Sequence, residues 1–447
     1  MSAGGPMDDK FKFQRKEREL RRRSRAASVE DAWARIEKDA DLSVKEKLEK
    51  LIHLSAPKKD KPRPKTPLEP LPREPLVFTD NPYPLPTRYG RTRLADGLSI
   101  KGDVLSYLSK NGAFADLDLS TALFIDLETT GLAGGTGTVA FLVGMGYYRD
   151  ERFHVAQYFL GEMGEERRLI EELGRFFKEM DFRSVVTYNG KAFDLPLLET
   201  RFILHRRPFI LTDLPHLDLL FSARSLWKHK HESCRLSHLA QQIVAAERSE
   251  DIPSAEIPFR YFDYLRSGDF SLIEPILYHN QEDILSLLGL LISAAKMFEA
   301  DREEEGSGEF DAMDMFGVAK VFESAGDLEK SMAFFERALA GDLPEELTTV
   351  IKRKLSFHFK RNADWEKAVS LWKDMSSLDD QLFCFRELAM YFEHKAKRLD
   401  DALKAAEEGL ALALNGPQAY RQDFEHRLER LAAKLQKQGT GRRPGEK

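Results

Sequence analysis

The stretch TALFIDLETTG, residues 121–131, decides the fold, because an apolar run leads into two carboxylates and then a turn. Residues two apart in a β-strand share a face, so the pattern predicts a strand that ends with Asp126 and Glu128 side by side. A buried pair of like charges is costly unless a cation compensates it, and hard divalent ions with oxygen ligands are the usual compensation. A bare Asp-x-Glu is also common as two solvated carboxylates, so the neighbouring elements must decide.

Apolar and helical patterns after this stretch predict a mixed sheet. Two more apolar runs, 138–148 and 152–160, follow the first, and their turn-rich connections favour an antiparallel meander. The pattern then continues with a helix over 165–179, a strand over 183–188, a helix over 194–205, a short strand over 216–220, and further helices to about residue 298. Three strands followed by alternating helix and strand predict an α/β ribonuclease H-like mixed sheet flanked by helices.

A second carboxylate element lies in TYNGKAFDLPLL, residues 187–198. A strand is expected to end at Asn189, and Asp194 falls near the start of the next helix. An aspartate at such a place is typical of an N-terminal helix cap. The functional alternative has Asp194 facing the first strand as a further metal ligand, with Asn189 and Lys191 near a phosphate or a sugar.

The third element is an apolar helix that contains HNQEDILSL, residues 279–287. His279 precedes Asp283 by four residues, which places the two about 40° apart around the helix axis and one turn apart along it. They should therefore share a face, whereas Tyr278, about 140° from Asp283, should point elsewhere. A surface hydrogen bond or an ion pair is the ordinary role of a lone His-x-x-x-Asp, and an imidazole that accepts a proton from water is the functional alternative.

These three elements, in this order, resemble a known family. The chain has an Asp-x-Glu in a first strand, an Asn-x-x-x-Phe-Asp after a later strand, and an Asn-x-x-Asp in a closing helix. Over roughly residues 85–298 it resembles the DEDD (DnaQ-like) 3′-5′ exonuclease superfamily, and in detail its YprB-type ribonuclease H-like branch. The most detailed agreement is in DLETTGLAGGTGTVAFLVGMGYY (126–148), TYNGKAFDLPLL (187–198), HLDLL with CRLSHLAQQI (216–243) and HNQEDILSL (279–287).

The resemblance implies a two-metal phosphodiester hydrolase. The metal ligands it implies are Asp126, Glu128, Asp194 and Asp283, with two Mg²⁺ or Mn²⁺ ions held against a phosphate of DNA or RNA. His279 then stands where the general base or the water-orienting residue sits. The substrate-binding positions are expected at Thr129, Thr130, Asn189 and Lys191. The absence of a Cys/His cluster disfavours zinc.

One departure from the family pattern concerns the base. Superfamily members usually place a tyrosine four residues, or a histidine five residues, before the last aspartate, whereas this chain has Tyr278 five residues and His279 four residues before Asp283. The subclass and the choice of base therefore stay open. The sequence also leaves open DNA against RNA and exonuclease against endonuclease. The rival hypothesis is a weakly active or inactive nucleic-acid-binding scaffold that acts through its helical repeats.

Beyond the acidic stretch EADREEEGSGEFD, strands disappear and helical patterns recur. GDLEKSMAFFERALA, ADWEKAVSLWKDM and KRLDDALKAAEEGLALAL are similar to one another, and they place Leu328, Trp365 and Leu399 at equivalent positions, 37 and 34 residues apart. A 34-residue period is typical of tetratricopeptide helix pairs, so an all-α helical-repeat domain is predicted, with an ordinary helical bundle as the alternative. Helices with mixed charge and no basic stripe favour a protein partner for this region.

The first part of the chain has a different composition. Residues 10–25 hold nine Lys or Arg against two Glu, and residues 57–75 hold seven prolines. These patterns predict a solvated basic segment and an extended linker. The whole chain is therefore divided into a basic disordered tail (1–27), short helices (28–56), a Pro-rich linker (57–84), the exonuclease domain (85–298), an acidic linker (299–310), tetratricopeptide-like repeats (311–435) and a disordered tail (436–447).

Composition limits the remaining classes. A net charge of -6 argues against a protein that coats nucleic acid by bulk charge, so binding must come from local basic regions or from metals. Only two cysteines, Cys234 and Cys384, occur in 447 residues, which excludes a disulfide framework and favours a reducing cytoplasm. No run of 18 apolar residues is present, so we expect no membrane association through a spanning helix.

Overall fold

The structure, a computed structural model, describes residues 74–131, 136–248, 251–299, 310–375, 381–414 and 416–441. The predicted basic tail (1–27), the short helices (28–56) and the linker up to residue 73 lie outside the described residues. The same holds for most of the predicted acidic linker and for residues 442–447.

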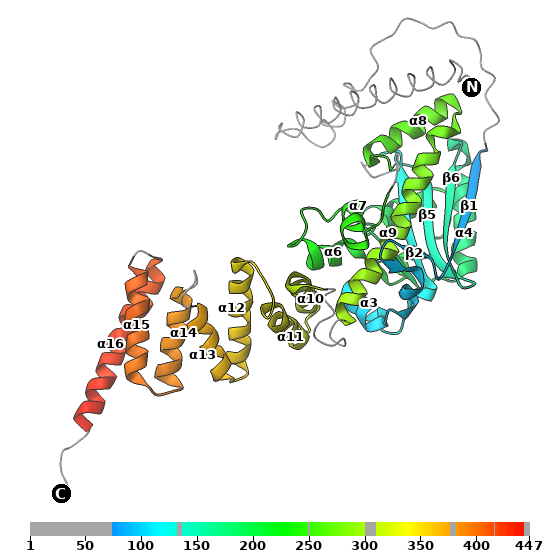
Figure 1. Cartoon of the computed structure of the whole chain (residues 1–447). Coiled ribbons are helices and arrows are strands. Elements are labelled where there is room, and N and C mark those ends of the chain that lie inside the picture. Colours follow the sequence, from blue (N-terminus) through cyan, green and yellow to red (C-terminus); the bar gives the residue numbers. More distant parts are fainter. Residues whose placement is uncertain are drawn as a thin grey trace, which may run out of the picture. The chain divides into compact units, whose positions relative to one another are not determined.

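A six-stranded mixed sheet forms the centre of the described chain (Figure 1). Its strands are β1 (Leu76–Pro84), β4 (Ala122–Thr129), β5 (Ala140–Arg149), β6 (Arg152–Leu160), β7 (Ser184–Thr187) and β8 (His216–Asp218). They stand in the order β1-β6-β5-β4-β7-β8. The first four pair antiparallel, whereas β7 and β8 continue from β4 in parallel. The predicted mixed sheet and its antiparallel meander are confirmed.

The strand β1 corrects one predicted boundary. Residues 57–84 were expected to be a Pro-rich linker, but β1 pairs with β6 along its whole length, from Leu76 opposite Leu160 to Pro84 opposite Arg152. Prolines at 82 and 84 do not break the pairing because β1 is an edge strand, where one side of the backbone needs no partner. The sheet domain therefore begins before residue 85.

Helices cover both faces of the sheet. Their bounds are α3 (Gly102–Ser109), α4 (Glu166–Met180), α5 (Asp194–Leu204), α6 (Leu219–Trp227), α7 (Leu236–Leu239), α8 (Ile257–Ser267) and α9 (Glu274–Glu299). Alternate residues of β4 face two cores: Leu123 and Ile125 join the cluster with α4 and α5, whereas Phe124 joins the cluster with α9. Asp126 and Glu128 have the same parity as Phe124, so the strand directs both carboxylates toward α9.

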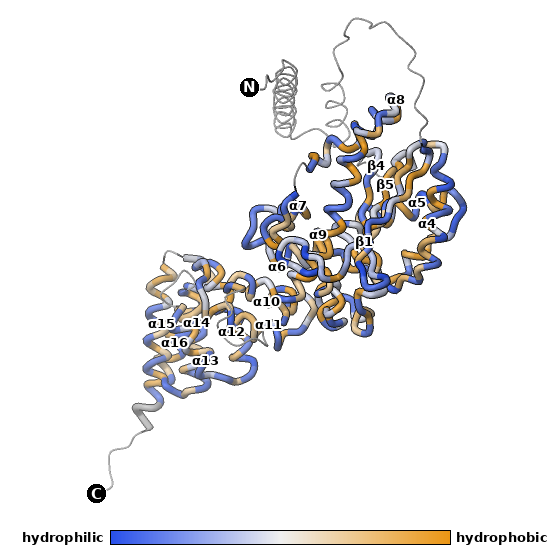
Figure 2. Tube along the Cα trace, turned by 45° about the vertical axis from the view of Figure 1, so that its right-hand side comes forward, coloured by the Kyte–Doolittle hydropathy of each residue, from blue (hydrophilic) through white to orange (hydrophobic). Residues whose placement is uncertain are grey.

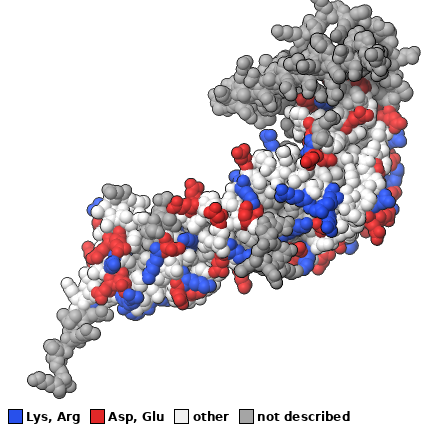
Figure 3. All heavy atoms as spheres, in the orientation of Figure 1, with Lys and Arg blue, Asp and Glu red and all other residues white. Residues whose placement is uncertain are grey.

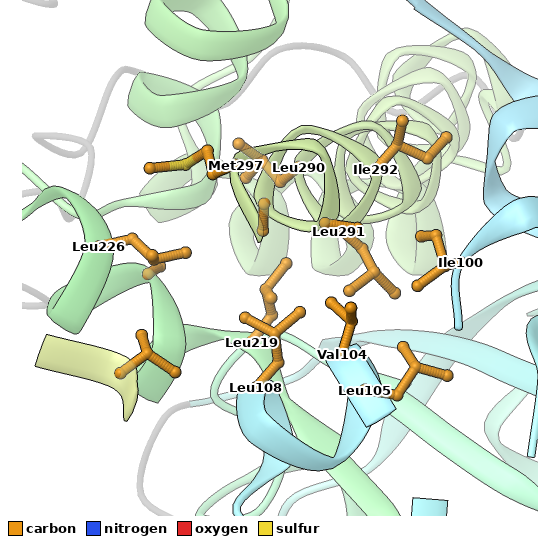
Figure 4. Packing of buried hydrophobic residues seen from close by; sticks show 14 of the residues in the cluster. Ile100, Val104, Leu105, Leu108, Leu219, Leu226, Leu290, Leu291, Ile292 and Met297 are labelled. Carbon is orange, nitrogen blue, oxygen red and sulfur yellow. The ribbon is translucent and has the colours of Figure 1, made fainter. Parts of the chain in front are cut away.

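The helix α9 is the main support of the second core. Its residues Leu290 and Leu291 pack against α3 and α6, with Leu105 and Leu226 among their neighbours (Figure 4). This helix is hydrophobic almost all round, which is typical of a buried helix. It therefore carries Asp283 into the centre of the domain on a rigid element.

A small hairpin lies against α9. It consists of β2 (Arg88–Tyr89) and β3 (Thr92–Arg93), joined through Gly90 with φ +55°. A Cβ at Gly90 would stand 2.0 Å from the carbonyl oxygen of Val244, and Arg91 N donates to the same oxygen at 2.7 Å. Only glycine allows both the backbone conformation and this close approach.

The C-terminal region consists of helices that pack in consecutive pairs. Their bounds are α10 (Ala312–Ala325), α11 (Leu328–Leu339), α12 (Glu345–Arg361), α13 (Trp365–Met375), α14 (Gln381–His394), α15 (Leu399–Ala413) and α16 (Gln418–Gly441). Leu328, Trp365 and Leu399 each begin the second helix of a pair, and hydrophobic and hydrophilic residues alternate along these helices (Figure 2). The predicted helical C-terminal region is confirmed. Its end is not at 435, because α16 continues to Gly441.

The first of these helices share the core of the sheet domain. Phe316 and Phe322 of α10 belong to the same buried cluster as Leu226 and Leu291. A Cβ at Gly317 would stand 2.3 Å from Leu226 O, so α10 lies directly on the end of α6. The helices before and after the predicted linker at 299–310 therefore share one hydrophobic core. Among the described residues, no helix combines the length and apolar character needed to cross a membrane.

Candidate metal centre

The end of β4 brings the first two predicted ligands together. Asp126 pairs with Gly144 and Glu128 with Leu142 of β5, and the register shifts directly after Glu128. A register shift at this place bends the strand and ends the regular pairing. Both carboxylates therefore stand at the C-terminal end of the central strand β4, on the α9 side, as the two-residue spacing predicts.

Asn280 fixes α9 against this strand. It is fully buried, and its Nδ2 donates to Asp126 Oδ2 at 2.9 Å while its Oδ1 accepts from Gln157 Nε2 at 2.9 Å. Gly144 leaves the space for this side chain, because a Cβ there would stand 2.0 Å from Asn280 Oδ1. Asn280 thus sets the register of α9 on the sheet, and it holds one oxygen of Asp126 in place.

His279 points into the same site. Its Nε2 lies 3.4 Å from Asp283 Oδ2 and 3.7 Å from Glu128 Oε1, while its Nδ1 lies 2.5 Å from Asp251 Oδ1. Burial alone would lower the pKa of His279, but the hydrogen bond to Asp251 and the charge of Asp283 raise it above its usual value. Tyr278 lies near Tyr83 and contributes to the raised pKa of that phenol. The structure therefore brings His279, rather than Tyr278, beside Asp283.

Arg248 is the one cation among the described residues that pairs with Asp283 besides His279. Its Nη2 lies 2.5 Å from Asp283 Oδ1 and its Nη1 lies 3.2 Å from Asp251 Oδ2. The same Nη2 donates to Ser286 Oγ at 2.7 Å. Burial would lower the pKa of Arg248, but these carboxylates raise it, so the guanidinium stays charged. Arg248 thus holds both Asp283 and Asp251, the carboxylate that contacts His279.

Asp194 is the first residue of α5, and the N-cap position belongs to Phe193. Asp194 is therefore not the N-cap of this helix, although its position in the sequence had suggested this role. Burial and the charge of Asp218 raise the pKa of Asp194 to about 7. Its own charge contributes to the raised pKa of Asp126 and of Glu128, which places Asp194 within electrostatic reach of the β4 pair.

The acids of the site destabilise one another's ionised forms. Burial and the charges of Asp283 and Asp194 raise the pKa of Asp126 well above its usual range. Burial and the charge of Asp126 do the same for Glu128. Each shift means that the charged form is disfavoured where it stands. The site is therefore short of positive charge, despite Arg248.

Three side chains of the site bring polar atoms close together. Among the described residues, Glu128, His279 and Asp283 each offer one atom, and the three atoms lie within 4.8 Å of one another. Asp126 and Asp194 lie outside this tight group. Oxygen donors with excess negative charge fit a hard divalent cation such as Mg²⁺ or Mn²⁺.

The predicted substrate-binding residues have structural contacts of their own. Asn189 adopts φ +68°, and the backbone N–H groups of Asn189 and Lys191 donate to buried Asp218 at 2.7 and 3.1 Å. The Thr129 hydroxyl donates to Gly131 O at 2.9 Å, and Thr130 Oγ1 accepts from Val139 N at 3.0 Å. Both threonines therefore close the turn after β4, while the Lys191 side chain is exposed.

Sequence reasoning missed Arg248 and Asp251 and gave Asn280 no role. Arg248 and Asp251 lie on irregular chain between a π-helical turn, Ala240–Val244, and α8, where no periodic pattern marks them. Asn280 was part of the quoted helix motif, but its partners come from β4 and β6. Only the tertiary structure shows these contacts.

Residues 123–295 match the RNase_H_2 model, described as RNase_H superfamily. The chain is 33% identical over 354 residues to the uncharacterized protein YprB of Bacillus subtilis (strain 168), covering 78% of this chain and 80% of that protein. The chain belongs to the YprB family. The ribonuclease H-like fold and the predicted YprB-type relationship are confirmed, and a divalent metal is usual for nucleases of this fold.

Among solved structures, this YprB-family chain is similar to the family B DNA polymerase from the hyperthermophilic archaeon Pyrobaculum calidifontis. The likeness covers 49% of this chain and 29% of that one, with 17% sequence identity and a TM-score of 0.32.

Proposed function

We propose that this protein is a metal-dependent nuclease of the DEDD type that hydrolyses phosphodiester bonds of DNA or RNA from the 3′ end. The observation that carries the proposal is the convergence of Glu128, His279 and Asp283 within 4.8 Å, on a ribonuclease H-like sheet. Two further acids, Asp126 and Asp194, stand within electrostatic reach of this group. Four mutually repelling carboxylates and a histidine near the end of β4 suit charge-stabilised phosphoryl chemistry better than a structural ion pair.

The four carboxylates, Asp126, Glu128, Asp194 and Asp283, would hold two Mg²⁺ or Mn²⁺ ions. Bound there, the ions would polarise the scissile phosphate and offset the charge that develops on its oxygens. The raised pKa values of Asp126 and Glu128 support this assignment, because a cation is the missing element that makes both ionised forms favourable. Asn280 keeps Asp126 oriented for that purpose.

His279 acts as the proton acceptor for the attacking water. Burial would raise the pKa of Asp251, but the bond to His279 lowers it, so Asp251 is an ionised acceptor. It therefore holds the Nδ1–H of His279. With metal ions offsetting the charge of Glu128 and Asp283, the neutral imidazole would present its Nε2 lone pair toward the site. An imidazole held in this tautomer can accept a proton at Nε2. Asp251 is a positioning residue, and Arg248 orients it in turn.

The remaining features agree with a nucleic-acid substrate. Lys191 is exposed after β7, where its ammonium can reach a phosphate. The helix pairs of the C-terminal region resemble tetratricopeptide repeats, and we assign them a protein partner. Two free cysteines in separate parts of the described chain suit a reducing cytoplasm.

The test is a substrate panel with the purified full chain. Single- and double-stranded DNA and RNA, labelled at the 5′ end, are incubated with Mg²⁺, with Mn²⁺ and with a chelator. The expected result is a metal-dependent ladder that shortens from the 3′ end and is lost in Asp194→Asn. A wild-type chain that binds these nucleic acids but cleaves none of them with either metal would instead support a scaffold.

A further inference from the structure

A second feature of the domain, apart from the metal centre, is a basic cavity beside the β2–β3 hairpin. The cavity has a volume of about 430 Å³, and its charged walls are Arg88, Arg91, Arg93, Lys296, Asp96 and Glu299. Lys and Arg side chains gather on the face that carries this hairpin (Figure 3). Four basic and two acidic residues line the cavity, so it carries an excess of positive charge, whereas the whole chain has a net charge of -6.

The arginines of this cavity are not used to hold the fold together. Lys296 forms an ion pair with Asp96 at 2.8 Å, which accounts for one cation and one carboxylate. Within the described ranges, no carboxylate forms an ion pair with Arg88, Arg91 or Arg93. All three are exposed, and among the described residues the only hydrogen bond of their guanidinium groups runs from Arg88 Nη2 to Arg91 O at 3.3 Å. Unpaired guanidinium groups around one cavity are suited to an anionic ligand.

Contacts within the domain hold the backbone of the β2–β3 hairpin, which carries these arginines, in one conformation. Gly90 is held against Val244 O, and Thr92 Oγ1 donates to Tyr89 O at 2.9 Å. The hydroxyl of Tyr89 contacts Glu282 Oε2 and Ser286 Oγ of α9, both at 2.8 Å. The hairpin is therefore anchored at its turn and at its base. Three guanidinium groups on a rigid hairpin lose less freedom on binding than three on a loose loop.

The uncharged walls suit more than a bare phosphate. Ile100, Ile292 and Ala295 line the cavity along with Ser99. The volume falls within the range of small-ligand sites, roughly 300–1,000 Å³. An apolar wall with arginines at the rim suits a nucleotide, whose sugar or base needs apolar contact and whose phosphates need guanidinium groups.

We propose that this cavity is a nucleotide-binding subsite, in which Arg88, Arg91 and Arg93 hold backbone phosphates of the polynucleotide outside the metal centre. The inference rests on the proposed nuclease function for the class of its ligand. The hairpin joins the two sites, because Tyr89 contacts Glu282 and Ser286 of α9, one and three residues from Asp283, while its neighbours Arg88 and Arg91 line the cavity. The chemistry of the cavity itself would accept a phosphate from a polynucleotide or from a free nucleotide.

The separation of the two sites favours the polynucleotide. Ile292 and Lys296 follow Asp283 by nine and thirteen residues in one straight helix, which is roughly 14–20 Å along its axis. At about 3.4 Å per base pair, this corresponds to about four to six base pairs of duplex. The cavity lies on a different face of α9 from Asp283, so it does not contact the scissile phosphate. It holds substrate that extends beyond the site of cleavage.

The experiment measures binding without cleavage. The full chain is titrated, in the presence of a chelator, against a fluorescent 20-nucleotide single-stranded DNA and its duplex over a series of salt concentrations. The test variant is R88A/R91A/R93A. The charge-matched control is R149A/R152A/R183A, whose arginines are exposed at the opposite end of the sheet from the carboxylates. R88K/R91K/R93K retains the charge and checks that the hairpin tolerates substitution.

The expected result is specific to the hairpin. R88A/R91A/R93A should weaken binding roughly tenfold to a hundredfold and reduce the slope of log affinity against log salt by about two to three, since each lost phosphate contact removes about 0.7–0.9. The lysine variant and the control should keep the wild-type slope. A slope in R88A/R91A/R93A equal to that of the control overturns the proposal. Deoxythymidine monophosphate that binds the wild type but not R88A/R91A/R93A, together with an unchanged oligonucleotide slope, also overturns it and assigns the cavity to free nucleotides.

The outcome is separable from that of the proposed function. Without metal, the binding slope does not depend on cleavage, so a wild-type chain that cleaves nothing can still show the hairpin effect. Conversely, cleavage of a dinucleotide, which is too short to reach the cavity, should be the same in R88A/R91A/R93A and in the wild type. Loss of dinucleotide cleavage would contradict the separation of the two sites.

Discussion

Buried carboxylates in the C-terminal helices and in the candidate metal centre differ in how their charge is compensated. Glu393, at the end of α14, is almost fully buried and pairs with Arg430 at 2.6 Å and with Lys434 at 2.8 Å. Burial alone would raise its pKa, but hydrogen bonds from Arg430 and Lys434 lower the pKa to about 2. Here the chain supplies the cations that a buried acid requires.

The metal centre shows the opposite balance. Asp126 and Glu128 have pKa values well above their usual range, because burial and neighbouring acids outweigh every favourable contact. Arg248 pairs with Asp283, and its charge only partly offsets the raised pKa of Asp126. Arg430 and Lys434 both pair with Glu393, whereas among the described residues no Lys or Arg forms an ion pair with Asp126 or Glu128. The difference supports the proposal that metal ions from outside the chain compensate these acids.

The largest expected effect follows from removing one of these acids. Asp126→Asn should lower turnover roughly 10³-fold or more, since losing a ligand forfeits several kcal/mol of charge stabilisation. The same substitution relieves repulsion, so the metal-free chain should melt at an equal or higher temperature. Turnover measured with Mn²⁺ checks the loss of activity, and thermal unfolding measured with a chelator checks the melting temperature. A variant that keeps wild-type turnover would remove Asp126 from the metal centre.

His279→Ala should lower turnover roughly 10²-fold, which is typical of losing a general base, and should leave metal binding largely intact. Tyr278→Phe is the matched control, because Tyr278 lies near Tyr83 rather than beside Asp283. Single-turnover rates at saturating Mn²⁺ distinguish the two. An inactive Tyr278→Phe beside a nearly normal His279→Ala would transfer the role of base to the tyrosine.

A smaller loss is expected from the positioning residue. Asp251→Asn keeps the shape of the side chain but removes the charge that holds His279 Nδ1–H, so turnover should fall about tenfold with KM unchanged. Asp251→Glu should recover part of the loss, because it restores a carboxylate. If kcat and KM change together, and Asp251→Glu is no better than Asp251→Asn, Asp251 is structural.

Much of this fold could be predicted from the sequence, where apolar residues repeat with the period of a strand or a helix. The two-residue period of β4 placed Asp126 and Glu128 on one face, and the helical spacing of α9 placed His279 beside Asp283. The confirmed antiparallel meander and mixed sheet followed from the order of apolar runs along the chain. β1 was missed because Asp80 and two prolines interrupt its apolar pattern, and its pairing with β6 is a contact between distant segments.

The other contacts of the site required the three-dimensional structure. Arg248 and Asp251 come from irregular chain, and their positions depend on how that chain crosses α9. Asn280 depends on Gly144 for its space. The basic hairpin was hidden by a net charge of -6, because composition averages a local group of arginines with acids elsewhere. The sequence predicted which residues share a face within one strand or helix, but it did not predict contacts between distant elements.

Divalent ions should stabilise the metal centre but not the Glu393 network. At a metal concentration 100 times the dissociation constant, binding to the folded state alone adds about 2.7 kcal/mol. Saturating Mn²⁺ should therefore raise the melting temperature of the wild type by several degrees and that of Asp126→Asn by less. Glu393→Gln should keep the full shift. A shift of equal size in Asp126→Asn and in the wild type would place the bound ion elsewhere.

The smallest effect on turnover is expected for Glu393→Gln, which should cleave like the wild type while its C-terminal helices lose stability. The folded pKa of Glu393 is about 2 against an ordinary value of 4.5, so its contribution is fully present above pH 4.5 and is lost as the pH falls toward 2. That difference corresponds to about 3 kcal/mol at neutral pH. Helical circular dichroism should show an earlier thermal transition for Glu393→Gln at pH 7, and the two proteins should converge near pH 2–3. If the two proteins melt alike at pH 7, the basic side chains around Glu393 contribute no net stability, and the contrast with the metal centre then rests on the metal centre alone.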